Sequence, residues 1–277
     1  MNAKHTVGII GLGPAGIGAA LQLARGGVDC AALEKGRIGG LLRAANLIEN
    51  MPGFKAITGE RACRLLEKQL RAQPARVINS DVKEIEFYKG AFALVTNNET
   101  ILSKYLIYAA GTQPIMPDLY REAESDITPL LNKSGMRIAV IGGGDAAFDY
   151  ALNLAKRNKV SILMRGKISR ALPLLQGRAI SDPNITVMPE VIMENIERRG
   201  DLFIIDGRDY DSALVAVGRK ANLELISNLN PVDLQDNMFI VGDAANGIFR
   251  QASIAFADGI RAAMAILNKE MNARRNI

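Results

Sequence analysis

Three glycines near the N-terminus have the spacing of a phosphate-binding turn. Gly11, Gly13 and Gly16 form the pattern G-x-G-x-x-G between the apolar run HTVGII and a segment with helical periodicity, AGIGAALQLAR. In this pattern the first glycine permits a tight turn, the second lets the backbone approach a pyrophosphate, and the third lets helix and strand pack closely. The phosphate lies at the helix N-terminus, where free N–H groups and the helix dipole favour an anion. Glu34 ends the next apolar run, about twenty residues on, where an acid accepts hydrogen bonds from a ribose 2′-OH.

A second turn of the same kind occurs in the middle of the chain. Gly142, Gly144 and Ala147 follow the apolar run MRIAVI and precede the helical segment AAFDYALNLAKR, and alanine is a permitted third residue. The next apolar run, VSILM, is followed by Arg165 and Arg170 instead of an acid. An arginine accommodates a 2′-phosphate that an acid would repel. The two turns therefore predict two dinucleotides, FAD or NAD at the first and NADPH, with NADH as the alternative, at the second.

Each turn belongs to a strand–turn–helix–strand unit, so the sequence contains an internal duplication. This arrangement predicts an α/β fold with two three-layer, Rossmann-like dinucleotide-binding domains. The two units are expected at 5–10, 15–25 and 28–33, and at 136–141, 146–157 and 160–164. The remaining expected strands are 75–79, 82–87, 91–96, 101–109, 185–188, 202–206, 212–217 and 238–241, and the remaining expected helices are 58–73 and 251–267.

Composition excludes several classes of protein. The 277 residues are 48% hydrophobic and 23% charged, as in globular proteins, and no apolar run is long enough to cross a membrane. The N-terminus has no signal-peptide pattern, so a cytoplasmic protein without membrane attachment is expected. The 34 basic and 29 acidic residues are interspersed over the chain as a whole, which argues against nucleic acid as a partner, and the net charge of +5 suits anionic small ligands or acidic proteins.

Cysteine and histidine usage argues against thiol, zinc and hydrolase chemistry. Cys30 and Cys63 are far apart, without disulfide or zinc spacing. Cys30 is expected to be a buried, inert thiol, and Cys63, on the expected helix 58–73, to be a packing residue or a bystander. His5 is the single histidine, and no G-x-S-x-G motif accompanies it. No metal site and no catalytic acid or base is predicted. Asp145 and Asp149 are candidates for contacts to the nicotinamide side of a nucleotide, or else plain helix charges.

Six further motifs occur in the order of a known family. They are Gly39-Gly40-Leu41, the ENMPGF segment at 49–54, Ala109-Ala110-Gly111, Gly218-Arg219, Gly242-Asp243 and Arg250-Gln251-Ala252. With the two turns they make the chain resemble the thioredoxin reductase-type flavoproteins, the low-molecular-weight branch of FAD/NAD(P) oxidoreductases. The resemblance implies a homodimer and an FAD domain split in sequence, residues 1–112 and 228–277, with an NAD(P)H domain inserted at 113–227. Linkers are expected at 111–117 and 218–231.

The resemblance also implies the residues that hold the cofactors. The 49–54 segment would run under the isoalloxazine, Asp243 would hold the ribityl chain, and Arg250 to Ala252 would lie at the pyrimidine edge of the flavin. The expected FAD contacts are Gly11, Gly13, Pro14, Ala15, Gly16, Glu34, Lys35, Gly40, Leu41, Asn50, Val82, Ala110, Gly111, Gly242, Asp243, Arg250, Gln251 and Ala252. The expected NAD(P)H contacts are Gly142, Gly144, Asp145, Ala146, Ala147, Arg165 and Arg170.

The chain departs from the family pattern at the redox-active disulfide. The family carries Cys-x-x-Cys shortly before its second glycine-rich turn, and residues 117–135 contain no cysteine here. Thioredoxin reduction is therefore not expected. Leu41 replaces the usual Gln, and Gly166 stands where the family has a second Arg, which weakens the NADPH assignment.

The electron acceptor is left open by these residues. One branch of the family without the cysteines exchanges electrons with ferredoxin or flavodoxin, and a small electron-carrier protein is the leading expectation. Seven cations near the second turn would either steer an acidic carrier or bind only nucleotide phosphates and solvent: Lys156, Arg157, Lys159, Arg165, Lys167, Arg170 and Arg178. The alternatives are reduction of quinone, free flavin or dioxygen, and a redox-silent sensor or scaffold.

Overall fold

The computed structural model describes residues 4–192, 196–230 and 237–275 and divides the chain into two compact units. Unit 1 comprises Met1–Arg43, Glu49–Thr112 and Ala221–Ile277, and unit 2 comprises Ala44–Ile48 and Gln113–Lys220. The chain crosses between the units at 112/113, where the sequence also placed a boundary, and at 220/221, where the sequence placed it at 227/228. It also crosses at 43/44 and 48/49, because Ala44–Ile48 belongs to unit 2, whereas the sequence placed all of 1–112 in the first FAD segment. Pro231, the last residue of the second expected linker, lies outside the described residues.

Unit 1 is built on a sheet whose centre is parallel. Strand β1 (Lys4–Ile10) lies between β2 (Cys30–Glu34) and β6 (Thr100–Tyr108), and β3 (Arg76–Asn79) pairs with the outer side of β2. In this register Ile10 is opposite both Leu33 and Tyr108, so the carboxyl ends of the three central strands lie level. Strand β16 (Met238–Ile240) from the last part of the chain pairs in parallel with the second half of β6.

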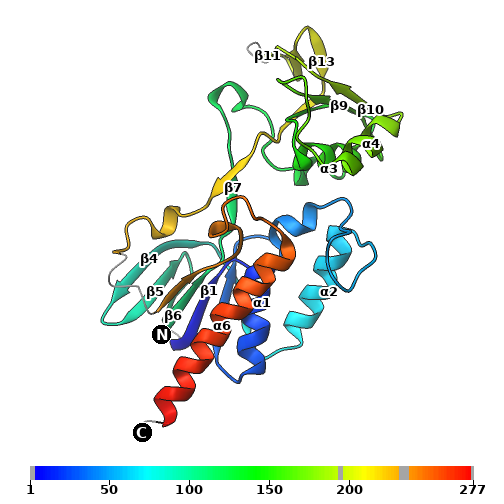
Figure 1. The fold of residues 1–277 in the computed structure, drawn as a ribbon. Helices are drawn as coiled ribbons and strands as arrows, with labels where there is room; N and C mark the ends of the chain where they lie inside the picture. Colours follow the sequence, from blue (N-terminus) through cyan, green and yellow to red (C-terminus); the bar gives the residue numbers. More distant parts are fainter. Residues whose placement is uncertain (1–3, 193–195, 231–236, 276–277) are drawn as a thin grey trace. The chain divides into compact units, whose positions relative to one another are not determined.

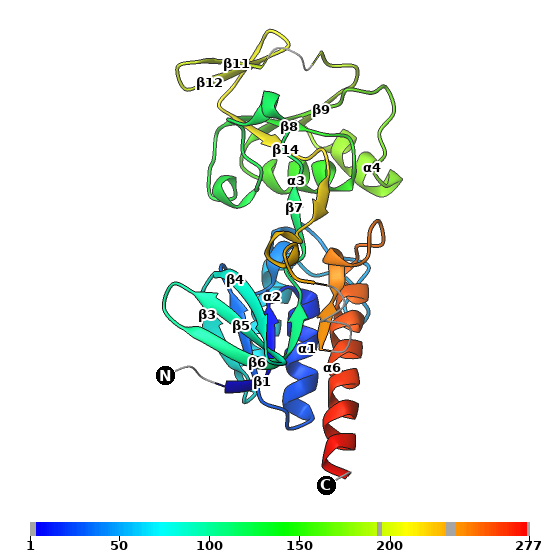
Figure 2. The same cartoon turned by 90° about the vertical axis from the view of Figure 1, so that its left-hand side faces the viewer.

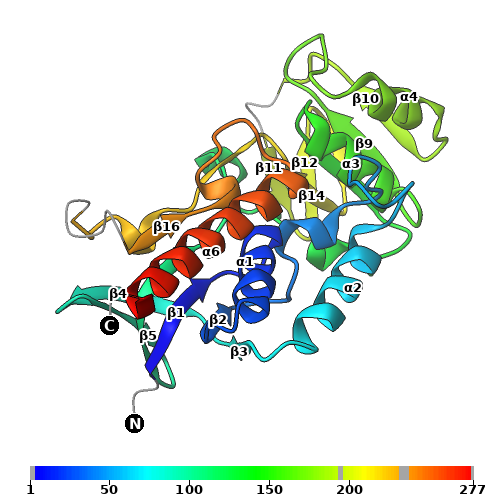
Figure 3. The same ribbon diagram turned by 60° about the horizontal axis from the view of Figure 1, so that its bottom comes forward.

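Two further layers cover this sheet. Helices α1 (Pro14–Arg25) and α6 (Ala252–Arg275) lie side by side on one face (Figure 3), with α2 (Gly59–Arg71) beside α1, around a core that includes Ile9, Leu23 and Ile266. The antiparallel strands β4 (Val82–Tyr88) and β5 (Ala91–Thr96) continue from the first half of β6. They enclose a second core with Leu33, Phe92 and Tyr108. Figure 1 shows the helices and the β4–β5 hairpin on different sides of β1.

Unit 2 repeats the first plan on a smaller scale (Figure 2). Its parallel sheet has the order β10–β9–β8–β14, formed by Ile185–Met188, Lys159–Leu163, Arg137–Ile141 and Ser212–Val215. Helices α3 (Asp145–Leu154) and α4 (Pro173–Ser181) pack on one face. The antiparallel strands β11 (Ile196–Arg199), β12 (Leu202–Ile205) and β13 (Arg208–Tyr210) pack on the other.

Short elements complete the chain. A two-stranded ribbon joins β7 (Thr112–Pro114) to β15 (Arg219–Ala221), where the chain passes between the units. Single-turn 3₁₀ helices lie at η1 (Gly40–Ala44), η2 (Asp118–Tyr120), η3 (Thr128–Leu130), η4 (Glu224–Ile226) and η5 (Gly242–Ala244).

The α/β fold with two dinucleotide-type units is confirmed, and the expected strands and helices occur with small shifts at their ends. Helix α6 continues to Arg275, beyond the expected end at 267. Helix α4 and the short strands β7, β11, β13 and β15 were not expected at all. Leu174 and Ile180 of α4 point into solvent, so this helix lacks the apolar period that indicates a buried face. In the described parts of the chain, no helix has the length and apolar character needed to cross a membrane.

Candidate cofactor sites

The first glycine turn connects β1 to α1 at the carboxyl edge of the unit 1 sheet. Gly11 has φ +91°, and a Cβ there would lie 2.5 Å from the Ala109 carbonyl oxygen. A Cβ on Gly16 would lie 1.9 Å from the Gly11 carbonyl oxygen. Gly13 differs from both, because a Cβ there would meet nothing within 4 Å. Gly11 and Gly16 are therefore required by the fold, whereas Gly13 opens the turn toward space that a ligand could fill.

The helix that follows this turn presents its N-terminus without a side-chain cap. Gly13 is the N-cap residue of α1, and Pro14 stands at the first helical position. Proline is suited to this position, since it has no N–H to leave unpaired. Such an end binds anions through its free backbone N–H groups. The turn thus has the open glycine and the polar helix end that a pyrophosphate requires.

Glu34 lies beside this turn, as the sequence predicts. Its Oε2 accepts a hydrogen bond from the Leu12 backbone N–H at 2.7 Å, and its Oε1 accepts one from the Gly36 N–H at 2.9 Å. These two bonds hold the carboxylate at the end of β2. Each carboxylate oxygen keeps a further lone pair, so Glu34 is able to accept a ribose hydroxyl without losing either bond.

The loop after β2 packs directly against the turn. A Cβ on Gly40 would lie 3.2 Å from the Gly13 Cα, and Gly39 donates its N–H to the Leu12 carbonyl at 2.7 Å. Gly39 has φ +114°, and a Cβ on it would lie 2.3 Å from the Cys63 Sγ. Cys63 therefore fills the space beneath this loop as a packing residue.

A buried arginine that the sequence analysis missed holds the same loop. The Arg43 side chain is 10% exposed and donates to both carboxylate oxygens of Glu60 at 3.0 Å and to the Ile38 carbonyl. Partial burial alone would raise the pKa of Glu60, but the bonds and charges of Arg43 and Arg37 outweigh it and hold that pKa below its usual value. Arg43 thus fixes η1 to α2. Only its position within the GGLLR segment could have drawn attention to it.

Segments from both ends of unit 1 meet next to the turn. The Asn50 Nδ2 donates to the Gln251 Oε1 at 2.8 Å, across 201 positions of sequence. Gly242 has φ +68°, and a Cβ on it would lie 2.8 Å from the Ala15 Cβ of α1. The sequence-predicted FAD contacts from three separate stretches of chain are therefore brought together in one unit.

The remaining predicted FAD contacts differ in what they offer. Lys35 and Leu41 are exposed, and Ala110 and Gly111 lie two and three residues beyond the end of β6. Val82 is 5% exposed and its side chain lies in the core with Phe92, so only its backbone is available to a ligand.

The second glycine turn, between β8 and α3 of unit 2, repeats the roles of the first. Gly142 has φ +150°, and a Cβ on it would lie 2.3 Å from the Ala216 carbonyl oxygen, whereas a Cβ on Gly144 would meet nothing within 4 Å. Ala147 takes the third position, and its side chain is fully buried. Its Cβ lies 3.3 Å from the point where a Cβ on Gly142 would stand. The space at Gly144 again faces a possible ligand.

A loop folds back onto this second turn. The Ser169 hydroxyl and the Arg170 N–H both donate to the Gly143 carbonyl, at 3.0 and 2.8 Å. The Asp145 Oδ1 accepts the Leu172 N–H at 2.7 Å. The side chains of Arg165 and Arg170 are left exposed beside the turn. The residues that the sequence assigned to NAD(P)H are thus held together, although Asp145 has a structural bond of its own.

Asp149, the other proposed nicotinamide-side acid, is bound to a different segment of unit 2. Its Oδ2 accepts the Asn46 N–H at 2.9 Å, and burial raises its pKa. Asn153 and Lys156 also bond to the 44–48 segment, through the Ala44 carbonyl and the Asn46 side chain. Asp149 is therefore used to hold this segment against α3.

Neither cysteine has the surroundings of a reactive thiol. Both are free and buried, and burial raises the pKa of Cys30 to about 12 and that of Cys63 to about 11. The thiolate is the reactive form, so both thiols are inert at neutral pH. Among the described residues, no group of three or more His, Cys, Asp or Glu could hold a metal ion.

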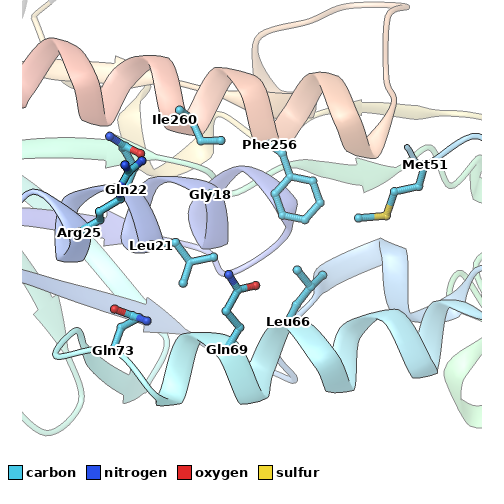
Figure 4. Close-up of a pocket in the computed structure, with 10 residues that line it drawn as sticks. All are labelled: Gly18, Leu21, Gln22, Arg25, Met51, Leu66, Gln69, Gln73, Phe256 and Ile260. Atoms are coloured by element: carbon cyan, nitrogen blue, oxygen red, sulfur yellow. The ribbon is translucent and has the colours of Figure 1, made fainter. Parts of the chain in front are cut away.

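A groove of about 510 Å³ lies between α1, α2 and α6 of unit 1. Figure 4 shows Met51, Leu66 and Phe256 at one end and Gln22, Arg25 and Gln73 at the other. Of its ten lining residues, Met51 alone belongs to a predicted cofactor segment, the 49–54 stretch expected to run under the isoalloxazine.

Comparison with known proteins agrees with this arrangement. A thioredoxin reductase of Mycoplasma genitalium is 27% identical over 93% of both chains, and the NADPH-dependent thioredoxin reductase 3 of Arabidopsis thaliana is 28% identical over 94% of this chain and 57% of its own length. The crystal structure of Lactococcus lactis thioredoxin reductase shares the fold, with a TM-score of 0.84 at 24% identity over 95% of this chain and 98% of that one. The sequence model of the protein family described as pyridine nucleotide-disulphide oxidoreductase matches residues 5–259. The chain is therefore a member of the pyridine nucleotide-disulphide oxidoreductase family, with a thioredoxin reductase-like fold.

Proposed function

We propose that this oxidoreductase passes electrons from NADPH through FAD to an acceptor outside the chain, without a redox-active disulfide. The observation that carries the proposal is the pair of open glycine turns with opposite charge beside them. Glu34 lies at the first turn, and Arg165 and Arg170 lie at the second. An acid suits an unphosphorylated ribose and an arginine suits a 2′-phosphate, so the two turns suit two different dinucleotides.

The residues of unit 1 fit FAD. The open space at Gly13 and the uncapped start of α1 would receive the pyrophosphate, and Glu34 would accept the ribose hydroxyls. The bonded pair Asn50 and Gln251 would lie beside the flavin ring. Held by these residues, FAD would supply the chemistry of hydride acceptance from a reduced nicotinamide and of one- or two-electron transfer to an acceptor. The protein contributes binding and orientation.

The residues of unit 2 fit NADPH. The open space at Gly144 would receive its pyrophosphate, and Arg165 and Arg170 would bind the 2′-phosphate through charge-assisted hydrogen bonds. The bonds of Ser169 and Arg170 to the Gly143 carbonyl keep this loop against the turn before the nucleotide arrives. A preformed loop of this kind lowers the entropy cost of binding.

The thiols support an acceptor other than an internal disulfide. Relatives are named thioredoxin reductases, but Cys30 lies inside β2 and Cys63 lies under Gly39, in positions set by packing. Because burial raises the pKa of both thiols, neither supplies the thiolate that a dithiol relay requires. A small electron-carrier protein such as ferredoxin or flavodoxin is the acceptor that we propose.

Nucleotide binding tests the assignment of unit 2. We expect Arg165→Glu/Arg170→Glu to weaken NADPH binding by at least about tenfold while NADH binding changes little, because each arginine–phosphate bond contributes about 1.5–3 kcal/mol. Arg199→Glu, which changes an exposed arginine on β11, serves as the matched control. If the double variant keeps the preference of the wild type for NADPH, the phosphate site is misassigned. If neither nucleotide reduces the bound flavin, the chain is a nucleotide-binding sensor or scaffold.

The assembly and location follow the resemblance. We propose a homodimer that works in the cytoplasm, which light scattering on the purified protein and fractionation of the source cells would test. A monomer at micromolar concentration would contradict the first part.

A further inference from the structure

Basic and acidic residues are interspersed over most of the chain, but one stretch of unit 2 carries cations alone. Residues 150–181 contain seven cations and no acid, whereas the whole chain carries a net charge of +5, so the rest of the chain is net negative. The stretch runs from α3 through β9 to the end of α4. Two of the seven cations, Arg165 and Arg170, are assigned above to the nucleotide. The other five cations are not needed to bind the single 2′-phosphate of NADPH.

The same stretch exposes large apolar side chains. The α4 patch is defined as Ile168, Leu172, Leu174 and Ile180, which are 85%, 57%, 55% and 72% exposed. Scattered apolar residues on a surface need no explanation, but a group on one short helix and the loop before it marks an interaction surface.

The geometry of α4 explains why these side chains face outward. Leu175 and Ala179 lie on its inner face and pack in the core with α3. Leu174, Gly177 and Ile180 are three residues apart and share the outer face. Gly177 has no side chain between the other two, and a Cβ on it would meet nothing within 4 Å. Figure 1 shows α4 at the edge of unit 2.

The α4 patch is held in place before any partner binds. The Leu172 N–H bonds to Asp145, and the Ala171 N–H bonds to the Ser169 hydroxyl, which in turn bonds to the Gly143 carbonyl. Lys167, exposed, lies in this same loop. A fixed apolar centre bordered by cations therefore adjoins the second glycine turn.

We propose that the α4 patch docks an acidic electron-carrier protein whose docking face has an apolar centre bordered by carboxylates. The inference rests on the proposed function, which requires an external acceptor. Charge complementarity selects this partner, because a second copy of the chain would bring two positive surfaces together. A lipid surface fits less well, since 151–181 contains no aromatic residue to sit at the membrane interface.

Charge inserted into the patch tests the proposal. We would measure binding of a purified acidic ferredoxin and a purified flavodoxin to the flavin-loaded protein by calorimetry, at low and high salt. We expect Leu174→Glu and Ile180→Glu to raise the Kd by at least about tenfold, and Leu174→Lys and Ile180→Lys to raise it much less. Tyr88→Glu, at a 70% exposed position on β4 in unit 1, is the matched control and should leave the Kd unchanged.

Reduction of ferricyanide by NADPH shows that the variants are folded and redox-active, and it should be unchanged in all of them. The proposal is overturned if neither carrier binds at low salt, or if the Glu variants bind both carriers like the wild type. It is also overturned if the Glu substitutions abolish only co-sedimentation with vesicles of equal parts phosphatidylcholine and phosphatidylglycerol. If neither nucleotide reduces the flavin of the wild type, the proposed function is refuted instead. Failure of the docking proposal is thus distinguishable from failure of the proposed function.

Discussion

The open glycines of the two turns make a sharp prediction. The change is Gly13→Ala in the first turn and Gly144→Ala in the second. Both positions have negative φ values, and an added Cβ meets no atom within 4 Å at either one. We therefore expect each variant to fold, with a free energy of unfolding of the nucleotide-free protein within about 1 kcal/mol of the wild type, since a weaker N-cap and a less flexible unfolded chain offset each other.

The effect on ligand binding should be much larger. A methyl group at Gly13 takes the place where the backbone approaches the FAD pyrophosphate. Loss of one charge-assisted hydrogen bond to the phosphate costs about 1.5–3 kcal/mol, which corresponds to about 10- to 150-fold weaker binding. Gly13→Ala should lose FAD by this factor, whereas Gly144→Ala should keep FAD and lose NADPH affinity.

The assay compares the two variants with each other. The flavin content after dialysis and the Kd for added FAD report on the first turn, and quenching or calorimetry with NADPH reports on the second. Each variant serves as the control for the other. The reasoning is refuted if Gly13→Ala retains FAD with an unchanged Kd, or if the two variants lose the same ligand.

The other predictions concern stability and reactivity. Gly16→Ala places a Cβ 1.9 Å from the Gly11 carbonyl, so it should destabilise the nucleotide-free protein by at least about 1–3 kcal/mol in denaturant unfolding, in contrast to Gly13→Ala. Burial raises the pKa of Cys30 to about 12 and that of Cys63 to about 11. A thiol reagent at neutral pH should therefore modify the folded protein at least about a hundredfold more slowly than the unfolded chain. Rapid labelling of either cysteine in the folded protein would contradict its burial. Arg43→Ala should lower the free energy of unfolding by about 1–3 kcal/mol, since it removes the charged bonds to Glu60. The pKa of Glu60 is lowered in the folded state, so the stability that its charged form contributes is present above the ordinary pKa of 4.5 and is lost as the pH falls below that value. The difference in free energy of unfolding between wild type and Arg43→Ala should therefore shrink on acidification. A difference that stays constant with pH would contradict the pairing of Arg43 with Glu60.

Local rules of backbone conformation explain which parts of the site were predictable. Gly11 and Gly142 have φ values of +91° and +150°, which only glycine adopts readily, so the two turns could be placed from sequence alone. The strands beside them are continuous apolar runs between turns, which is typical of buried parallel strands.

Contacts between distant segments were not predictable in the same way. Arg43 is an ordinary cation in the sequence, and only the fold brings it within 3.0 Å of Glu60. Asp145 and Asp149 were candidates for nucleotide contacts, and the structure shows that both accept backbone N–H groups, from Leu172 and Asn46. No local pattern indicates such bonds, because they depend on how loops return to the sheet.

Helix α4 escaped prediction for another reason. Its apolar residues face solvent at Leu174 and Ile180 as well as the core at Leu175, so no single face is apolar. Its outward apolar residues are not buried by folding, so they do not produce the periodic pattern from which a helix is predicted.

The most direct test of the account is an anaerobic titration of the flavin-loaded Cys30→Ser/Cys63→Ser variant with NADPH, followed through the visible absorbance of the flavin. We predict that a stoichiometric amount of NADPH bleaches the flavin as rapidly as in the wild type, that NADH is less effective, and that an added acidic carrier protein restores the absorbance. A reduced flavin that the carrier re-oxidises in the wild type but not in the variant would show that the thiols pass the electrons on, and would contradict the account.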